Sequence, residues 1–292
     1  MKEEGALHGR ERALPRRNRL RRFQRIPMRF VLPNLVTLLA ICLGLTGVRF
    51  AIEGVFDFAV YAIIVAAILD GLDGRIARAL KGTSRFGAEL DSLADFVDFG
   101  VAPALVLYLW SLHEYRSPGW FAALIFAIAG ALRLARFNVM IDDPNKPAWS
   151  GHFFVGMPAP AGAIMVMLPL YLHFGLGMEN NRAYVPFEIA YVLLIAFLMA
   201  SRIPHFSGKR IGRVPREWFI PVLLGILATL LLIVMFTMQM LIVLSLAYLA
   251  LIPLSVRRFL AYQQADEAAA AAAQEAVVGE KDGAVGAPTP HL

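Results

Sequence analysis

Charged residues and cysteine are both scarce in this sequence. Of its 292 residues 17% are charged, whereas an average soluble domain has about 25%. Hydrophobic residues make up 58% and the mean hydropathy is +0.61, which excludes a water-soluble globular enzyme, a disordered protein and a coiled coil. The single cysteine, Cys42, excludes an intrachain disulfide and a cysteine-based zinc site. The apolar residues instead gather in long runs, as they do in membrane proteins.

These apolar runs predict an all-α membrane protein. A membrane-spanning helix needs about 20 mostly apolar residues. The sequence has eight such stretches, so we expect a polytopic bundle of about eight transmembrane helices. The stretches are 30–50, 55–72, 96–112, 119–137, 157–176, 185–201, 218–236 and 238–256. The helix of the third stretch is expected to begin in the polar residues that precede it.

The basic residues predict the orientation of the bundle. If the N-terminus is cytoplasmic and the spans alternate, 25 of the 28 Lys and Arg residues fall on the cytoplasmic side, and only Arg49, Arg116 and Arg182 fall on the other. Cytoplasmic loops are the loops enriched in Lys and Arg, so both termini are expected in the cytoplasm. The net charge of +6 then reflects contact with anionic lipids, and we expect no nucleic-acid partner.

Four aspartates lie where the second apolar stretch ends and the third begins. Asp70 and Asp73 are three residues apart, and Asp91 and Asp95 are four apart. On a helix both spacings place the two side chains on one face. An ionised Asp at the centre of a bilayer costs about 2.5–3.5 kcal/mol. The four carboxylates therefore need a compensating positive charge.

Two kinds of partner could supply that charge. One is a network of ion pairs with the neighbouring basic residues Arg75, Arg78, Lys81 and Arg85. The other is a divalent cation, Mg²⁺ or Mn²⁺, which prefers carboxylate oxygens and is usually shared with substrate phosphates. Gly74 and Gly87 favour the cation, because a glycine leaves room for a ligand although it disfavours a helix by about 1 kcal/mol relative to Ala.

The complete spacing resembles the signature of the CDP-alcohol phosphatidyltransferase family. The segment reads Asp70-x-x-Asp73-Gly74-x-x-Ala77-Arg78, then eight residues, then Gly87-x-x-x-Asp91-x-x-x-Asp95, and it matches all eight fixed positions of that signature. The resemblance implies an integral membrane enzyme with a catalytic core of six helices, often a homodimer. Such enzymes transfer a phosphatidyl group from a CDP-linked lipid to an alcohol and release CMP.

The resemblance also implies roles for individual residues. The residues that would hold one or two divalent cations are Asp70, Asp73, Asp91 and Asp95, and Asp95 would also be the general base. The residues that would contact the CDP group are Gly74, Arg78 and Ser84. The run Pro33-Asn34-Leu35-Val36-Thr37 resembles a second element of the family, which places Asn34 and Thr37 in the nucleotide pocket. The alternative for Asn34 and Thr37 is a helix start with local backbone hydrogen bonds.

Three further segments, 131–139, 156–162 and 201–209, resemble bacterial members of the family that use L-serine as the acceptor. They imply transfer from CDP-diacylglycerol to L-serine at the cytoplasmic face of a bacterial inner membrane. Arg133, Arg136 and Asn138 would bind the carboxylate of the acceptor or a lipid phosphate. The alternative for the two arginines is to anchor the helix at the membrane surface.

The resemblance divides the chain into four segments. Residues 28–215 form the expected catalytic core, and residues 216–260 form two additional transmembrane helices. Residues 1–27 are a basic cytoplasmic tail that is expected to lie on anionic lipid. Residues 261–292 contain six consecutive alanines and then Gly, Pro and Thr, and they are expected to form a disordered cytoplasmic tail in which a frayed helix is followed by coil.

Three other functions are compatible with parts of this pattern. The first is the same chemistry with another acceptor, namely glycerol 3-phosphate, inositol phosphate or choline. The second is a cation transporter, which predicts ligands near the bilayer midplane and inverted repeats. The third is a structural membrane scaffold, in which the aspartates serve no activity.

Overall fold

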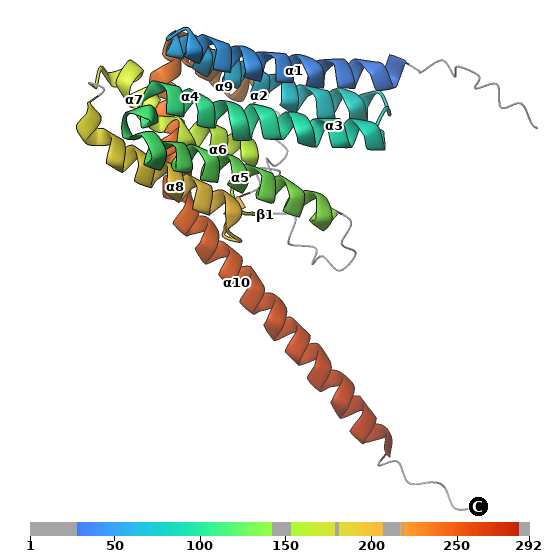
Figure 1. Cartoon of the computed structure of the whole chain (residues 1–292). Helices are drawn as coiled ribbons and strands as arrows, with labels where there is room; N and C mark the ends of the chain where they lie inside the picture. Colours follow the sequence, from blue (N-terminus) through green and yellow to red (C-terminus); the bar gives the residue numbers. More distant parts are fainter. Residues whose placement is uncertain (1–27, 142–152, 179–180, 207–216, 218, 286–292) are drawn as a thin grey trace, which may run out of the picture.

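The computed structural model of the chain is a bundle of helices from which one long helix, α10, extends outward (Figure 1). It describes residues 28–141, 153–178, 181–206, 217 and 219–285. The basic tail 1–27 lies outside these residues. The α-helices are α1 (Met28–Ile52), α2 (Phe56–Ala79), α3 (Arg85–Asp95), α4 (Ala102–Trp110), α5 (Arg116–Ile141), α6 (Ala159–Val166), α7 (Leu168–Leu176), α8 (Val185–Ala200), α9 (Phe219–Met235) and α10 (Thr237–Val285).

Shorter elements connect these helices. A π-helical turn, η1 (Phe96–Val101), joins α3 to α4, and 3₁₀ turns precede α5 and α8, namely η2 (Leu112–Tyr115) and η4 (Arg182–Tyr184). Two short strands, β1 (Phe153–Val155) and β2 (Pro204–Phe206), pair in antiparallel register with Phe154 opposite His205. The described chain is otherwise mostly helical, and these two strands were not predicted, because three residues are too few to show an alternating apolar pattern.

A helix, or a pair of joined helices, lies at each of the eight apolar stretches. Among the described residues, four helices are long and apolar enough to cross a membrane: Met28–Ile52, Arg85–Trp110, Leu112–Met140 and Thr237–Asp266. The pair α6–α7, bent by 45°, brings the number to as many as five. The chain is therefore an integral membrane protein, but a count of eight spans is not confirmed. Helix α8 is apolar but shorter than the helices counted as spans. The last turns of α2 contain the charged residues of the aspartate motif.

The helix of the third stretch begins in polar sequence, as expected. It runs without a break in the backbone from Arg85 through η1 to Trp110. At the other end of the chain, α10 continues to Val285, so the helical start expected for the tail from residue 261 is longer than a frayed end. The physical reason is the run of alanines, the residue with the highest helix propensity.

Small residues let α1 lie directly against α2. The buried stripe of α1 is Pro33, Thr37, Ala40, Gly44, Gly47 and Ala51, at alternating spacings of three and four residues. A Cβ added to Gly47 would lie 3.1 Å from the carbonyl oxygen of Ala59 in α2. Such interfaces allow close backbone approach between membrane helices. Here the packing fixes Thr37 of α1 against the last turns of α2, where the aspartates lie.

Gly44 provides a test of this packing. A Cβ there would overlap Oδ1 of Asp98 and would lie 2.9 Å from its Cγ. We expect Gly44→Ala to lower the free energy of unfolding by about 1–3 kcal/mol, as overpacking does. Thermal unfolding in detergent would measure the effect. Gly225→Ala on α9 is the control, because a Cβ there meets open space.

Asp98, the residue that the added Cβ would overlap, gives a second check. Asp98→Ala removes the two carboxylate oxygens and Cγ, so the double variant Gly44→Ala/Asp98→Ala should unfold at a higher temperature than Gly44→Ala alone. Equal stability of Gly44→Ala and the unmodified protein would show that α1 does not lie this close to η1.

Candidate active site

The four predicted aspartates converge at one end of the bundle. Asp70 and Asp73 lie in the last turns of α2, and Asp91 and Asp95 lie on α3. Each of Asp70, Asp73 and Asp91 offers a carboxylate oxygen, and these three oxygens all lie within 4.8 Å of one another. Asp95 lies against Asp70, and one of its oxygens, Oδ1, is buried with no hydrogen-bond partner in the part of the chain that the structure describes. The structure thus brings carboxylates of both pairs close together, while their role as cation ligands stays a prediction.

A tight turn brings the two acidic helix faces together. Helix α2 ends at Ala79, and the chain reverses through Lys81, whose φ of 50° is rare for a residue with a side chain. Ser84 then begins α3 as its N-cap, and its Oγ accepts a hydrogen bond of 3.0 Å from the amide of Gly87. Ser84 was predicted as a contact to CDP, and the structure shows that it also starts the helix that carries Asp91.

Neighbouring side chains do not neutralise the carboxylates. Within the part of the chain that the structure describes, none of the four aspartates forms an ion pair with Lys or Arg. The ion-pair network considered from the sequence is therefore not formed by the described residues. The donor set consists of carboxylate oxygens, one of them buried and unpartnered, and this chemistry fits a hard divalent cation such as Mg²⁺ or Mn²⁺.

A cavity of about 220 Å³ opens beside the aspartates. All five residues predicted to contact CDP line it: Asn34, Thr37, Gly74, Arg78 and Ser84. Asp73 and Asp91 also line it, so two of the candidate cation ligands share one space with the candidate nucleotide contacts. Pro33, Ala77 and Gly87 line it too, and so do Gly82, Thr83 and Ala88, which were not predicted.

Two glycines shape this cavity in different ways. A Cβ on Gly87 would lie 3.0 Å from Oδ1 of Asn34 and 3.1 Å from Oγ of Ser84, so glycine allows α3 to approach α1. A Cβ on Gly74 would have Nη1 of Arg78 as its nearest neighbour, at 3.6 Å. The guanidinium of Arg78 therefore lies over Gly74, at the edge of the cavity, where a planar fork of donors can meet phosphate oxygens.

The hydroxyl of Thr37 contacts both its own helix backbone and a carboxylate of the acidic site. Its Oγ1 donates a hydrogen bond of 2.5 Å to Oδ2 of Asp73, and the carbonyl oxygen of Pro33 lies 3.2 Å away. The hydroxyl has one proton, so the shorter contact to Asp73 is the stronger. Thr37 thus orients a candidate cation ligand, in the way that outer hydrogen bonds orient metal ligands.

The structure separates the three residues predicted at the acceptor site. Nη1 of Arg136 donates a hydrogen bond of 3.0 Å to the carbonyl oxygen of Ser201, at the end of α8. Nδ2 of Asn138 donates to Oγ of Ser92 over 3.0 Å. Arg133 is buried, with 8% of its surface exposed, and lies close enough to Asp95 for electrostatic attraction. Of the three, Arg133 is the residue that interacts electrostatically with a carboxylate of the acidic site. Residues 207–209 of the related segment lie outside the described residues.

Sequence reasoning missed one acidic residue near this site. Asp98, in η1, is 1% exposed, and both of its carboxylate oxygens are buried with no hydrogen-bond partner among the described residues. It lies near enough to Asp70 for mutual repulsion. The signal was available, because a charged residue inside an apolar run is unusual and π-helical turns are frequent at functional sites.

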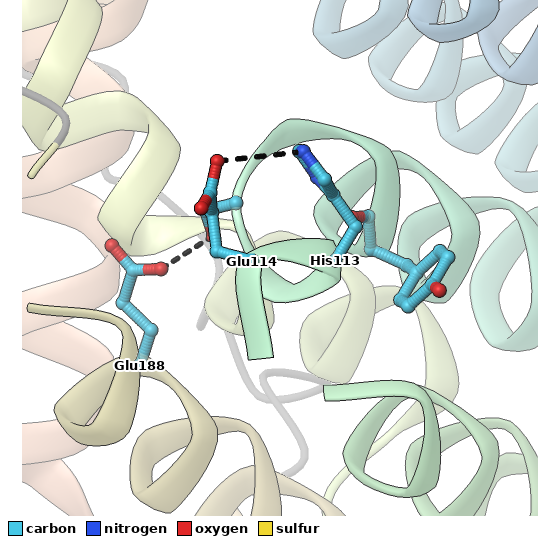
Figure 2. Close-up of polar contacts among 5 residues, drawn as sticks. His113, Glu114 and Glu188 are labelled. Atoms are coloured by element: carbon cyan, nitrogen blue, oxygen red, sulfur yellow. Dashed lines mark hydrogen bonds and ion pairs between the residues drawn. The ribbon is translucent and has the colours of Figure 1, made fainter. Parts of the chain in front are cut away.

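A second polar cluster lies at the other end of the bundle, where α4 ends and α8 begins. Figure 2 shows His113, Glu114 and Glu188 there, and the Ser111 hydroxyl donates a hydrogen bond to Glu188. Nε2 of His113 lies 3.7 Å from Oε1 of Glu114. The predicted site residues are not part of this cluster.

Comparisons with known proteins agree with the motif. Residues 30–201 match the family described as CDP-alcohol phosphatidyltransferase. The chain is 43% identical over 230 residues to a CDP-diacylglycerol–serine O-phosphatidyltransferase of Mycobacterium tuberculosis, covering 78% of each chain. It is 49% identical over 176 residues to the protein of the same name from Mycobacterium leprae, covering 60% of this chain and 57% of that one. The corresponding protein of Helicobacter pylori is 36% identical over 186 residues, covering 62% of this chain and 74% of that one.

The chain therefore belongs to the CDP-alcohol phosphatidyltransferase family. Its matched segment begins at the third residue of α1, runs to the end of α8 and contains every predicted site residue.

Proposed function

We propose that this protein transfers the phosphatidyl group of CDP-diacylglycerol to L-serine, forming phosphatidylserine and releasing CMP. The observation that carries the proposal is the shared cavity, in which Asp73 and Asp91 lie beside Arg78 and Asn34. A nucleoside diphosphate needs cationic neutralisation and directed donors, and this space offers a carboxylate set for a cation and a guanidinium for phosphate oxygens. The names of the relatives support L-serine as the acceptor.

The residues that would hold Mg²⁺ or Mn²⁺ are Asp70, Asp73, Asp91 and Asp95. When bound, the cation would neutralise charge on the pyrophosphate and on the leaving phosphate. Arg78 would donate hydrogen bonds to the pyrophosphate oxygens and hold them in one orientation. Thr37 would keep the Asp73 carboxylate in place through its hydrogen bond.

Asp95 is the proposed general base. A carboxylate within reach of the serine hydroxyl takes its proton while the oxygen attacks the phosphorus next to the diacylglycerol. The new bond joins the serine oxygen to this phosphorus, and the bond from phosphorus to the CMP phosphate oxygen breaks. CMP leaves with the electron pair of that bond. Direct transfer of this kind depends mainly on positioning and on stabilisation of charge.

The acceptor is the part of the proposal that an assay decides directly. Purified protein would be given CDP-diacylglycerol of defined composition and, separately, L-serine, glycerol 3-phosphate, inositol phosphate or choline. Release of CMP and the lipid product would be measured for each acceptor. We expect CMP and phosphatidylserine with L-serine. CMP release with another acceptor and none with L-serine would overturn the serine assignment and leave the family chemistry intact.

We also propose that the site faces the cytoplasm of a bacterial cell, at the inner membrane. The support is the distribution of basic residues, since the turn between α2 and α3 belongs to the segments that contain 25 of the 28 Lys and Arg residues. The division into a core at 28–215 and two additional helices at 216–260, and a homodimeric assembly, are proposed on the family resemblance.

A further inference from the structure

A second cavity, of about 240 Å³, lies at the end of the bundle opposite the aspartates, between the end of α4, helix α7 and the start of α8. Asp91 and Trp110 lie nineteen residues apart on one continuous helix, which corresponds to about 28 Å. No residue of the acidic site lines this second cavity. What it binds is therefore independent of the proposed function. Aliphatic side chains line it together with five rings and one carboxylate, which belong to Trp110, His173, Tyr184, Phe187, Tyr191 and Glu188.

Glu188 gives this apolar cavity a negative charge. It lies half-buried in the first turn of α8, and the buried Ser111 hydroxyl donates a hydrogen bond to its Oε2 (Figure 2). Within the described chain no other group donates to this carboxylate, and no Lys, Arg or His lies at ion-pair distance from it. A carboxylate has about four acceptor positions, and a half-buried one is unfavourable unless a cation joins it. Oε1 of Glu188 is thus open to a donor from a bound molecule.

The rings in the wall are arranged differently from the aromatic belt of a membrane protein. Belt residues lie at the headgroup level of the bilayer, whereas Trp110 is buried, with 7% of its surface exposed. The rings of Trp110 and His173 have centroids 5.8 Å apart and planes tilted by 53°. The Tyr191 hydroxyl donates a hydrogen bond of 2.8 Å to the carbonyl oxygen of Met165, which fixes the ring. Aromatic faces attract cations that lie within about 6 Å of their centroids.

This donor and acceptor set selects an organic cation over a metal ion. A hard metal ion takes six or more oxygen ligands, and the side chains that line this cavity include a single carboxylate, Glu188. His173 is directed elsewhere, because its Nδ1 donates to the carbonyl oxygen of Met178. In the neutral ring this leaves Nε2 as an acceptor. One carboxylate among aromatic rings is the arrangement that recognises an ammonium group.

We propose that this cavity is a second ligand site, which binds an ammonium group attached to an apolar body. Glu188 is the counter-charge, and the Ser111 hydroxyl holds its carboxylate in place. The rings cover the cation and the apolar part of the ligand. An aminophospholipid headgroup and a free amine share this chemistry. The proposed orientation of the bundle places the site at the non-cytoplasmic surface, which both kinds of molecule can reach.

Binding of 2-phenylethylammonium tests the site, with the neutral 2-phenylethanol for comparison. Equilibrium dialysis of the purified full-length protein in a maltoside detergent would give both Kd values. A hydrogen bond to a charged group corresponds to about a tenfold to hundredfold change in affinity. We therefore expect the ammonium compound to bind at least about tenfold more tightly than the alcohol. Glu188→Gln keeps the size of the side chain and an acceptor for Ser111, and it should remove this difference.

Two further variants locate the binding. Glu114→Gln is the matched control, because Glu114 is an exposed carboxylate at the same end of the bundle and does not line the cavity. It should leave the Kd for 2-phenylethylammonium within about twofold. Trp110 reports on the cavity directly. The ammonium compound should change tryptophan emission in the unmodified protein, and Trp110→Phe should lose most of that change.

Short-chain lipids distinguish the two sources of the ammonium group. Dihexanoyl phosphatidylethanolamine would be added as a competitor, with dihexanoyl phosphatidylglycerol as the lipid without an amine. Competition by the first lipid alone supports the site and assigns it to a lipid headgroup. If neither lipid competes while 2-phenylethylammonium binds, the result supports the site and assigns it to a free amine.

The proposal fails if charge does not matter at this cavity. Equal Kd values for the ammonium compound and the alcohol in the unmodified protein would overturn it. An unchanged Kd for the ammonium compound in Glu188→Gln would overturn it as well. If Glu188→Gln does not fold, the comparison of the two compounds in the unmodified protein and the emission of Trp110 decide. None of these measurements uses catalytic activity, so they stand whichever acceptor the enzyme uses.

Discussion

Replacement of Asp95 by Asn is expected to reduce kcat by about 10²- to 10⁴-fold, the usual contribution of a general base. The amide has nearly the shape of the carboxylate but cannot accept the proton of the acceptor hydroxyl. Because the cavity for CDP is lined by Asp73 and Asp91 and not by Asp95, binding of CDP-diacylglycerol should be largely preserved. Single-turnover release of CMP and the Kd for CDP-diacylglycerol would measure the two effects separately.

Glu89→Gln is the matched control for this substitution. Glu89 lies on the same helix, α3, and is exposed to solvent. Its replacement should leave turnover within a factor of about two, as surface substitutions usually leave stability nearly unchanged. Turnover of Asp95→Asn near that of the unmodified protein would contradict the assignment of the base. Loss of CDP-diacylglycerol binding together with turnover would assign Asp95 to the cation alone.

The second large effect is expected on removal of the divalent cation or of one of its ligands. A chelator should abolish CMP release, and Mg²⁺ or Mn²⁺ should restore it. Asp91→Asn should lower activity by more than about 100-fold, because loss of a residue that only orients a ligand already costs about 10- to 100-fold. Asp57→Asn, at the opposite end of α2, is the control and should remain active.

Although Asp91→Asn should lose activity, its thermal stability without a cation should not fall. The carboxylates of Asp70, Asp73 and Asp91 lie close together, and without a cation they repel one another. Asp91→Asn removes part of this repulsion, so in chelator it should unfold at the same temperature as the unmodified protein or above it. The cation stabilises only the protein that binds it. Mg²⁺ should therefore raise the unfolding temperature of the unmodified protein more than that of Asp91→Asn. Equal shifts would contradict a cation site at Asp91.

The acidic site could be predicted from sequence because its geometry is mostly local. The spacings of Asp70 with Asp73 and of Asp91 with Asp95 are fixed by helical periodicity, and a short turn joins the two helices. The contacts to α1 depend on tertiary packing, which periodicity does not contain. The family resemblance placed Asn34 and Thr37 in the pocket, but the hydrogen bond from Thr37 to Asp73 was seen only in the structure.

Other features also depend on tertiary packing and could not be predicted from local sequence patterns. Arg133, Arg136 and Asn138 are close in sequence, yet they turn to different partners, since α5 meets several elements along its length. The pairing of His205 with Tyr248 joins residues 43 positions apart. The apolar runs indicated where helices lie. They did not establish how many helices cross the membrane, because α2 and α8 combine apolar sequence with charge or short length.

The central claim is that carboxylates from α2 and α3 hold a divalent cation which also contacts a nucleotide diphosphate. Electron paramagnetic resonance of Mn²⁺ titrated into the purified protein tests it most directly, with Asp73→Asn as the comparison. We predict a bound Mn²⁺ signal in the unmodified protein that changes when CDP-diacylglycerol is added, and a much weaker signal in Asp73→Asn. Equal Mn²⁺ binding by both proteins, or a signal that CDP-diacylglycerol leaves unchanged, would contradict the account.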